Sequence, residues 1–174
     1  LGDVEPRKVR VRAHYDESSV TVYQRFRVDI AQEAVKLQTF GQLFSRNKPY
    51  SWIKPSFFWM MYRSDWNQEG SPDQRILRIQ VRRSFFNDML EKATLTSMPR
   101  NGYFSNESTW RYERDHVRLN RVQWDPERDE YLQRDLGKRA IQLGIHRKNY
   151  TDYINNVMTV TDITESITGI RDRI

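Results

Sequence analysis

The sequence has no cysteine among its 174 residues. This absence excludes a disulfide framework, a thiolate nucleophile, and zinc or iron–sulfur sites that depend on cysteine ligands. The three histidines, His14, His116 and His146, lie far apart in the sequence, so a metal site would need carboxylates to join them. We therefore expect no metal, and the redox compartment stays open.

The sequence also lacks a long apolar segment. No run approaches the roughly 18 residues that cross a bilayer, and the first residues, LGDVEPRKVR, are too charged for the core of a secretory signal. We therefore expect a soluble, intracellular, cytoplasmic protein with no membrane partner. The length is that of one domain, residues 1–174.

Several familiar catalytic motifs are missing. The sequence contains no GxGxxG, GxxxxGK[ST], HExxH or GxSxG. These patterns mark dinucleotide folds, P-loop proteins, zinc proteases and serine hydrolases, respectively. Any enzymatic function must therefore depend on a less familiar arrangement of side chains.

Lysine is scarce compared with arginine. The chain has 22 Arg and 7 Lys against 23 acidic residues, for a net charge of +6. The planar guanidinium matches phosphate geometry, so this balance favours an anionic partner, either a nucleotide or a nucleic acid. Genome composition also explains a high arginine content, and composition alone does not decide between the two explanations.

The hydrophobic pattern of the first third predicts strands and a helix. Alternation over 8–15 predicts a half-buried strand with one basic face. A second alternation over 20–30 includes Gln24 as its one polar member. We expect Asp29 to cap a helix that begins near Ile30 and ends at Phe40.

The middle of the chain holds its densest apolar segment. WIKPSFFWMMYRSDW at 52–66 predicts a core helix with Pro55 in its first turn. We expect a strand at 75–81, a helix from 84 to 93 and an exposed loop over 94–106.

The last third mixes both kinds of element. We expect a helix or strand at 110–122, a turn at WDPERD (124–129) capped by Asp125, a strand at 139–145, and helices at 149–158 and 163–170. The order predicts an α+β fold with a curved, mainly antiparallel sheet partly covered by helices. A ferredoxin-like or barrel arrangement stays open.

The segment 52–66 also carries candidate binding residues: Trp52, Lys54, Ser56, Tyr62 and Arg63. An aromatic wall beside a cation suits a nucleobase or nicotinamide ring with an attached phosphate. The alternative is a core helix whose basic side chains extend to water.

Two glutamines interrupt apolar strands. Gln24 and Gln142 need hydrogen-bond partners when buried. Such an amide can bind a ligand's carboxamide or sugar hydroxyl, or join two strands, and both interpretations stay open.

Four segments in order resemble a known family. They are RAHYDESSVTVYQRF, WIKPSFFWMMYRSDW, WDPERD and RAIQLGI. Together they resemble the uncharacterised domain-of-unknown-function family 4291 from about Val11 to Thr164. The chain departs from that family where NKPYSWIKPSF replaces a shorter RMTWIKPSF, and at His14, where an acidic or polar residue is common. The resemblance names a family without an activity.

A weaker likeness concerns the order of elements. A first strand with Arg12, a second that ends in VYQ, and the helix IAQEAVKLQTF after it are similar to the opening of the ADP-ribosyltransferase superfamily. That resemblance implies NAD as donor, an aromatic strand end that holds nicotinamide, and a later strand that supplies an acid or amide. The reaction breaks the glycosidic bond to nicotinamide, so charge builds on the ribose.

Mapped onto this chain, the resemblance implies roles for particular residues. Arg12 with Lys54 or Arg63 would bind the phosphates, Tyr23 would stack on the ring, and Gln142 would orient the ribose where many transferases have an acid. The complete predicted site comprises Gln142 and Gln24 as catalytic candidates and Arg12, Tyr23, Trp52, Lys54, Ser56, Tyr62, Arg63 and Arg139 as binding residues.

Three functions follow from these patterns. We favour an ADP-ribosyltransferase-like or nucleotide-processing enzyme that binds NAD or a related nucleotide and acts on a nucleic-acid acceptor. The alternative is a non-catalytic RNA- or DNA-binding module that uses basic and aromatic side chains. The third and simplest function is that of an interaction domain whose aromatic residues serve only to form the hydrophobic core. The acceptor and the oligomeric state stay open.

Overall fold

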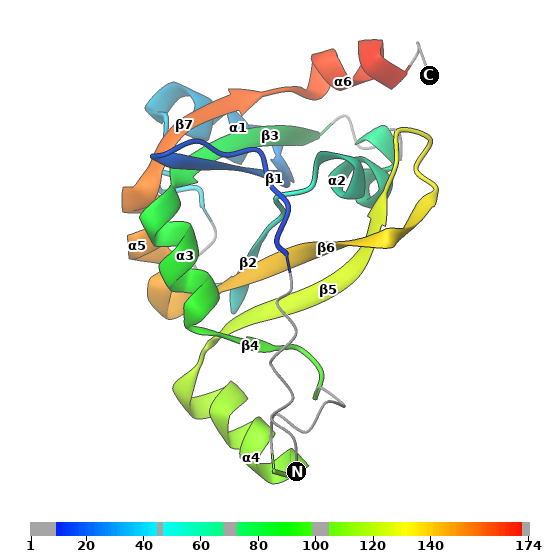
Figure 1. The fold of residues 1–174 in the computed structure, drawn as a ribbon. Coiled ribbons are helices and arrows are strands. Elements are labelled where there is room, and N and C mark those ends of the chain that lie inside the picture. Colours follow the sequence, from blue (N-terminus) through cyan, green and yellow to red (C-terminus); the bar gives the residue numbers. More distant parts are fainter. Residues whose placement is uncertain (1–9, 45–46, 68–72, 99–104, 172–174) are drawn as a thin grey trace.

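Two β-sheets face each other across the main hydrophobic core (Figure 1). The computed structural model describes residues 10–44, 47–67, 73–98 and 105–171. One sheet has the strand order β1-β3-β7 and the other the order β2-β6-β5-β4. All pairings are antiparallel except that of β4 with β5. The prediction of an α+β, mainly antiparallel fold is thus confirmed, with two sheets in place of one curved sheet.

The strands alternate with helices along the chain. The strands are β1 (Ser19–Arg27), β2 (Tyr50–Ile53), β3 (Gln74–Arg82), β4 (Ala93–Leu95), β5 (Asn120–Arg128), β6 (Arg134–His146) and β7 (Val157–Asp162). The α-helices are α1 (Val28–Leu37), α2 (Phe57–Ser64), α3 (Arg83–Glu91), α4 (Glu107–Tyr112), α5 (Tyr150–Asn156) and α6 (Thr164–Arg171). Short helical turns cover Asp65–Asn67, Glu113–Val117 and Arg147–Asn149.

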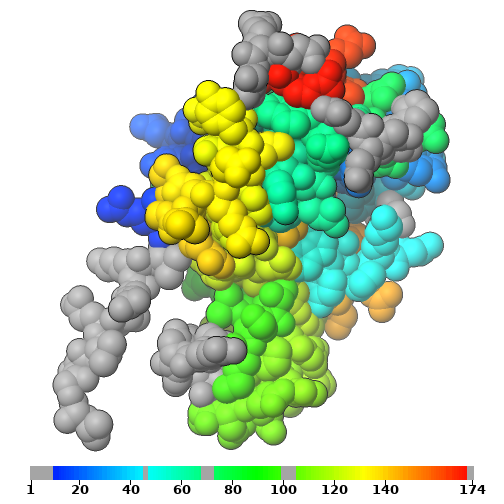
Figure 2. Space-filling view, turned by 90° about the vertical axis from the view of Figure 1, so that its right-hand side faces the viewer, coloured from blue at the N-terminus to red at the C-terminus, as the bar shows by residue number. Residues whose placement is uncertain are grey.

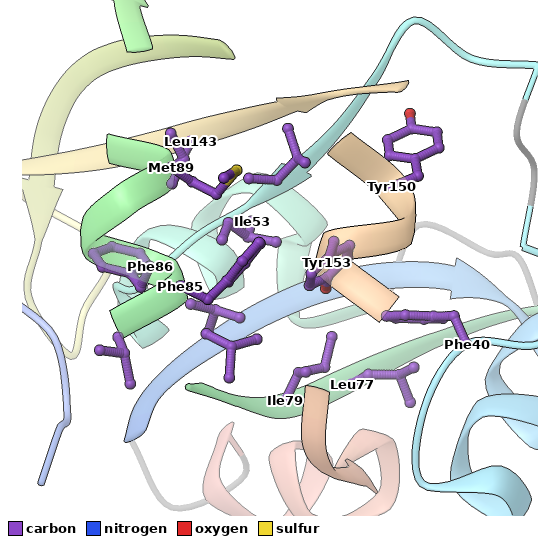
Figure 3. Packing of buried hydrophobic residues seen from close by; sticks show 14 of the residues in the cluster. Phe40, Ile53, Leu77, Ile79, Phe85, Phe86, Met89, Leu143, Tyr150 and Tyr153 are labelled. Atoms are coloured by element: carbon purple, nitrogen blue, oxygen red, sulfur yellow. The ribbon is translucent and has the colours of Figure 1, made fainter. Parts of the chain in front are cut away.

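The core between the sheets is closed by aromatic residues (Figure 3). Leu77 and Ile79 of β3 face it from one sheet, and Ile53 and Leu143 from the other. Tyr153 of α5 stacks on Phe85 of α3 with ring centroids 5.9 Å apart. Each fully buried side chain of this size contributes about 1.5–3 kcal/mol, so this shared core holds the two sheets together.

A second, smaller core lies on the other side of the β1 sheet. Tyr23 and Ile76 pack there against Met60 and Met61 of α2, and against Ile167 of α6. Because this cluster fixes α2 against β1, it positions the segment that leads into the helix. That segment carries three of the predicted binding residues, Trp52, Lys54 and Ser56.

The core helix predicted within 52–66 is confirmed as α2, but its predicted start is wrong. Residues 50–53 form β2, in which Ser51 and Ile53 are buried and Tyr50 and Trp52 are half-buried. The helix begins only at Phe57, where the Ser56 hydroxyl caps it by accepting the Trp59 N–H. Pro55 disfavours helical geometry in the residue before it, and this separates strand from helix.

Three other expectations are also wrong. Of the predicted strand over 8–15, Arg10 to His14 are not in a strand, and Val9 lies outside the described residues. The proposed turn at 124–129 is largely β5, and Asp125 accepts side-chain amides there in place of capping a helix. Asp29 does not cap α1 either, since the N-cap is Arg27.

The remaining elements differ mainly in their ends. The predicted strand at 75–81 is confirmed as β3, and the helix at 84–93 as α3. The helix predicted at 149–158 stops at Asn156, because Val157 begins β7. Within the predicted loop at 94–106, β4 ends at Leu95, and 99–104 lie outside the described residues.

The described residues include neither a membrane-spanning helix nor a cluster of metal-binding side chains. No helix in the described part of the chain is long and apolar enough to span a bilayer. Over the same residues, no group of three or more histidine or acidic side chains is placed to hold a metal ion.

Candidate functional site

Two cavities flank the point where the sheets touch. There the Tyr23 N–H donates to the Lys54 carbonyl at 2.8 Å and the Lys54 N–H to the Tyr23 carbonyl at 3.2 Å. A cavity of about 440 Å³ lies among Arg12, Tyr23, Ser56 and Glu127, and we call it the carboxylate cavity. A cavity of about 500 Å³ lies among Gln24, Arg25, Lys48, Trp52 and Lys54, and we call it the cationic cavity.

Glu127 is the buried carboxylate of the first cavity. A β-bulge between Pro126 and Glu127 shifts the pairing of β5 with β6, and bulges of this kind re-aim a side chain. Glu127 is 9% exposed, and its Oε1 accepts the Ser56 hydroxyl at 2.5 Å and the Arg128 N–H at 2.9 Å. Both of these bonds go to Oε1, and no described residue donates a hydrogen bond to Oε2.

Ser56 holds that carboxylate from the start of α2. Its hydroxyl donates to Glu127 and at the same time accepts the Trp59 N–H at 3.0 Å. The residue therefore links the helix N-terminus to β5. A carboxylate fixed by a hydroxyl and a backbone N–H is pre-oriented toward a ligand.

Aromatic rings form one wall of the carboxylate cavity. Tyr23 and Phe57 line it in an edge-to-face pair with centroids 5.5 Å apart, and Phe58 continues the wall. Burial raises the pKa of the Tyr23 phenol, and the charge of Arg78 opposes that shift. The phenol is therefore neutral at physiological pH, so the wall is an uncharged surface for a planar ring.

Basic side chains form the rest of this cavity. Arg12, Arg128 and Lys138 line it together with the acids Asp129, Glu130 and Asp135. The pKa of Asp135 is lowered by hydrogen bonds from Lys138 and from the Gly137 N–H and by the charges of Lys138 and Arg12. The cavity thus offers opposite charges at different points of its wall.

Arg128 has a distinctive place in that wall. Its guanidinium lies 3.5 Å from the ring centroid of Tyr62, and its Nη1 donates to the Leu132 carbonyl. Its Nε is buried without a hydrogen-bond partner. A donor left in this way is costly unless a ligand or water satisfies it.

The β5–β6 hairpin gives the cavity its outer rim. Figure 2 shows the hairpin (yellow) beside α2 (teal), with the described N-terminal segment (blue) on the other side of the hairpin. Asp129 holds the hairpin turn by accepting the N–H groups of Tyr131 and Gln133. The rim therefore has an ordered hydrogen-bonded turn.

Gln24 sits at the back of the cationic cavity. Its Nε2 donates to the Ser51 hydroxyl at 2.9 Å and the Trp52 carbonyl at 3.0 Å, and its Oε1 accepts the Tyr153 hydroxyl at 2.6 Å. The amide joins β1 to β2 and to α5. Of the two interpretations of Gln24, ligand binding or the joining of two strands, these contacts fit the second.

Lys54 lies between the cationic cavity and the outer face of β2. Its Nζ donates to the Trp52 carbonyl at 2.9 Å. Burial, together with the charges of Arg63 and Arg25, lowers its pKa to about 8, and the charge of Asp125 acts in the opposite direction.

The predicted site residues separate into three places. Arg12, Tyr23 and Ser56 meet in the carboxylate cavity, and Gln24, Trp52 and Lys54 in the cationic cavity. The other predicted residues, Gln142, Arg139, Tyr62 and Arg63, line neither cavity. Gln142 donates to Asp125 at 2.9 Å, and the exposed Arg139 donates to the Trp124 carbonyl. Tyr62 and Arg63 are exposed on α2.

Sequence reasoning missed Glu127 and Arg128. Both belong to WDPERD, which the sequence analysis assigned to a turn. The available signal was a glutamate directly after a proline inside a segment with apolar flanks, because a proline in a strand marks an edge or a bulge.

Fold and site together define a class: a two-sheet α+β protein in which a cavity with a buried carboxylate lies beside a cation-lined cavity. The chain belongs to the family described as Domain of unknown function (DUF4291), whose model matches residues 10–174. This match confirms the family resemblance of the four sequence segments. No curated protein matches the chain.

Proposed function

We propose that the protein is an ADP-ribosyltransferase-like enzyme that binds NAD in the carboxylate cavity and breaks its bond between nicotinamide and ribose. The observation that carries this proposal is the buried Glu127 carboxylate, held by Ser56 in a cavity with an aromatic wall. The volume of about 440 Å³ falls in the usual range for small-molecule sites.

The chemistry of the bond suits these groups. When the C–N bond breaks, nicotinamide takes the bonding electron pair and leaves neutral, and positive charge builds on the ribose as in glycoside cleavage. A carboxylate beside the ribose stabilises that charge. The acceptor's nucleophile then bonds to the ribose C1′ and loses its proton to solvent.

The remaining side chains divide the ligand between them. Tyr23 and Phe57 offer a ring surface for nicotinamide, and Arg12 and Arg128 offer donors for the pyrophosphate. Glu127 supplies the acid that the superfamily resemblance implies on a later strand. This assignment replaces Gln142, which lines neither cavity and is bonded to Asp125.

The test measures NAD binding by calorimetry and nicotinamide release by chromatography. We expect Glu127→Gln to keep NAD affinity within about threefold and to lower release by at least about a hundredfold, the scale of one lost electrostatic catalyst. Arg12→Ala should weaken binding. Glu91→Gln, an exposed carboxylate on α3, is the matched control and should change neither.

The proposal fails on either of two results. One is the absence of binding heat at millimolar NAD together with no nicotinamide release from the wild-type protein. The other is a Glu127→Gln variant with unchanged release. Thermal melts of each variant separate loss of chemistry from loss of folding.

A further inference from the structure

The second cavity has a charge that the proposed reaction does not explain. The described residues around it include four basic side chains, Arg25, Arg27, Lys48 and Lys54, and no acidic one. Arg27 pairs with Asp29, but Arg25, Lys48 and Lys54 form no ion pair within the described part of the chain. Three cations that line one cavity and form no ion pair with a described residue attract an anion that carries more than one charge.

Trp52 adds an aromatic surface to these cations. Gly144 of β6 lies opposite Trp52 in the pairing of β2 with β6, and a Cβ at Gly144 would lie only 3.0 Å from the indole. The glycine therefore lets the ring lie closely against the strand. The indole is half-buried and lines the cavity, so part of it is open to a ligand.

The positive field continues along β2. At its far end Arg121 lies over the Tyr50 ring at 5.4 Å, and Tyr50 contacts His146. The pKa of His146 is lowered by burial and by the charges of Lys148, Arg147 and Arg121. At the near end, the charges of Arg63 and Arg25 likewise lower the pKa of Lys54. Basic side chains therefore lie near both ends of the strand, where Arg121 pairs with Asp115 and Asp125 acts on Lys54 in the opposite direction.

We propose that the cationic cavity and Trp52 form a binding site for single-stranded nucleic acid. Phosphates would lie on Arg25, Lys48 and Lys54, and a base would stack on the free part of the Trp52 indole. A cationic groove with an aromatic platform is the physical arrangement that binds single strands with little sequence preference.

The site is independent of the transfer chemistry, because it shares no lining residue with the carboxylate cavity. The two cavities flank the same Tyr23–Lys54 bridge. Where both sites work, the bound strand is the acceptor. Where the transferase proposal fails, the strand still binds, and Glu127→Gln should keep that affinity unchanged.

The experiment measures fluorescence anisotropy of a labelled eight-nucleotide RNA and of the DNA of the same sequence, at physiological salt. We expect binding to at least one of them, tighter than to a duplex of that sequence. Trp52→Leu should weaken binding by about tenfold or more, and Trp52→Phe, which keeps a ring, by less than about threefold, given the usual contribution of one stacked base.

Charge variants provide a second, fold-preserving test. Lys48 is exposed, so Lys48→Ala should fold normally and weaken binding several-fold. Lys36→Ala removes an exposed lysine of α1 that lines neither cavity and should leave binding unchanged. Melting curves confirm the folding of each variant.

Three results would overturn the proposal. The first is no binding of either oligonucleotide. The second is equal competition by polyphosphate or poly-glutamate of the same charge, which would show a site for any polyanion. The third is unchanged affinity in both Trp52→Leu and Lys48→Ala.

Discussion

Gln24 illustrates how one polar side chain can organise the contact between two sheets. Its side-chain hydrogen bonds to described residues run to β2 and to Tyr153, so the amide is satisfied inside the protein. The sequence signal, a lone glutamine in an apolar strand, correctly marked a residue that needs partners. It did not say whether those partners are ligand or protein, because the pattern of one strand does not show which strand lies beside it.

Removal of the Tyr153 hydroxyl should lower the stability of the protein, because the buried Gln24 amide loses a hydrogen bond. Tyr153→Phe leaves the Gln24 Oε1 without its 2.6 Å donor in the core. An unsatisfied buried acceptor costs about 1–3 kcal/mol, and we expect the free energy of unfolding in urea to fall by that amount. Tyr112→Phe, at an exposed tyrosine, is the control and should change it by less than about 0.5 kcal/mol. Equal effects would contradict the assignment.

Lys54 should make stability depend on pH. Its pKa falls from 10.5 unfolded to about 8 folded, so from about pH 8 to 10.5 the unfolded chain binds more protons and stability rises with pH. Below pH 8 the full penalty is present, at most about 3 kcal/mol. Lys54→Met should therefore be more stable than wild type at pH 7, with the difference narrowing by pH 10. A constant difference across that range would refute this.

At the scale of elements, β2 and α2 show where sequence patterns lose their power. Trp52 and Ile53 alternate in exposure as strand residues do, yet they precede a helix whose first five residues are also apolar. Four residues are too few for a period to be read, and only Pro55 and Ser56 mark the boundary. Long periodic elements such as β3 and α3 were predictable because their pattern repeats several times.

The packing of β2 on β6 provides a prediction for Gly144. Gly144→Ala places a Cβ 3.0 Å from the Trp52 ring, so the indole must move away from the strand. We expect altered tryptophan emission and a loss of about 1 kcal/mol of stability. In the double variant with Trp52→Leu that loss should shrink, which a double-mutant cycle measures. Gly137→Ala is the control, since its Cβ would meet an atom only at 3.4 Å. Additive effects would exclude the contact.

At the scale of the molecule, the sheets decide which predicted residues meet. The superfamily likeness grouped Arg12 with Tyr23, and these two do share a cavity, which Ser56 of the 52–66 segment also lines. Glu127 could not be grouped with them from sequence, because its direction depends on a bulge that arises only when β5 pairs with β6. The division into two cavities depends likewise on the bridge between Tyr23 and Lys54. The same two segments meet where Gln24 bonds to Ser51, which lies 27 residues further along the chain.

The excess positive charge should appear in the salt dependence of oligonucleotide binding. Each phosphate neutralised on a single strand contributes about −0.7 to the slope of log K against log salt. Three unpaired cations, Arg25, Lys48 and Lys54, therefore predict a slope of about −2 from this cavity. Lys48→Ala should make the slope shallower by about 0.7, whereas Lys36→Ala should leave it unchanged, because only the first touches phosphate. Titrations of the labelled RNA across a range of salt concentrations measure both. Equal shifts in the two variants would mean that the net charge of +6, and not this cavity, attracts the strand.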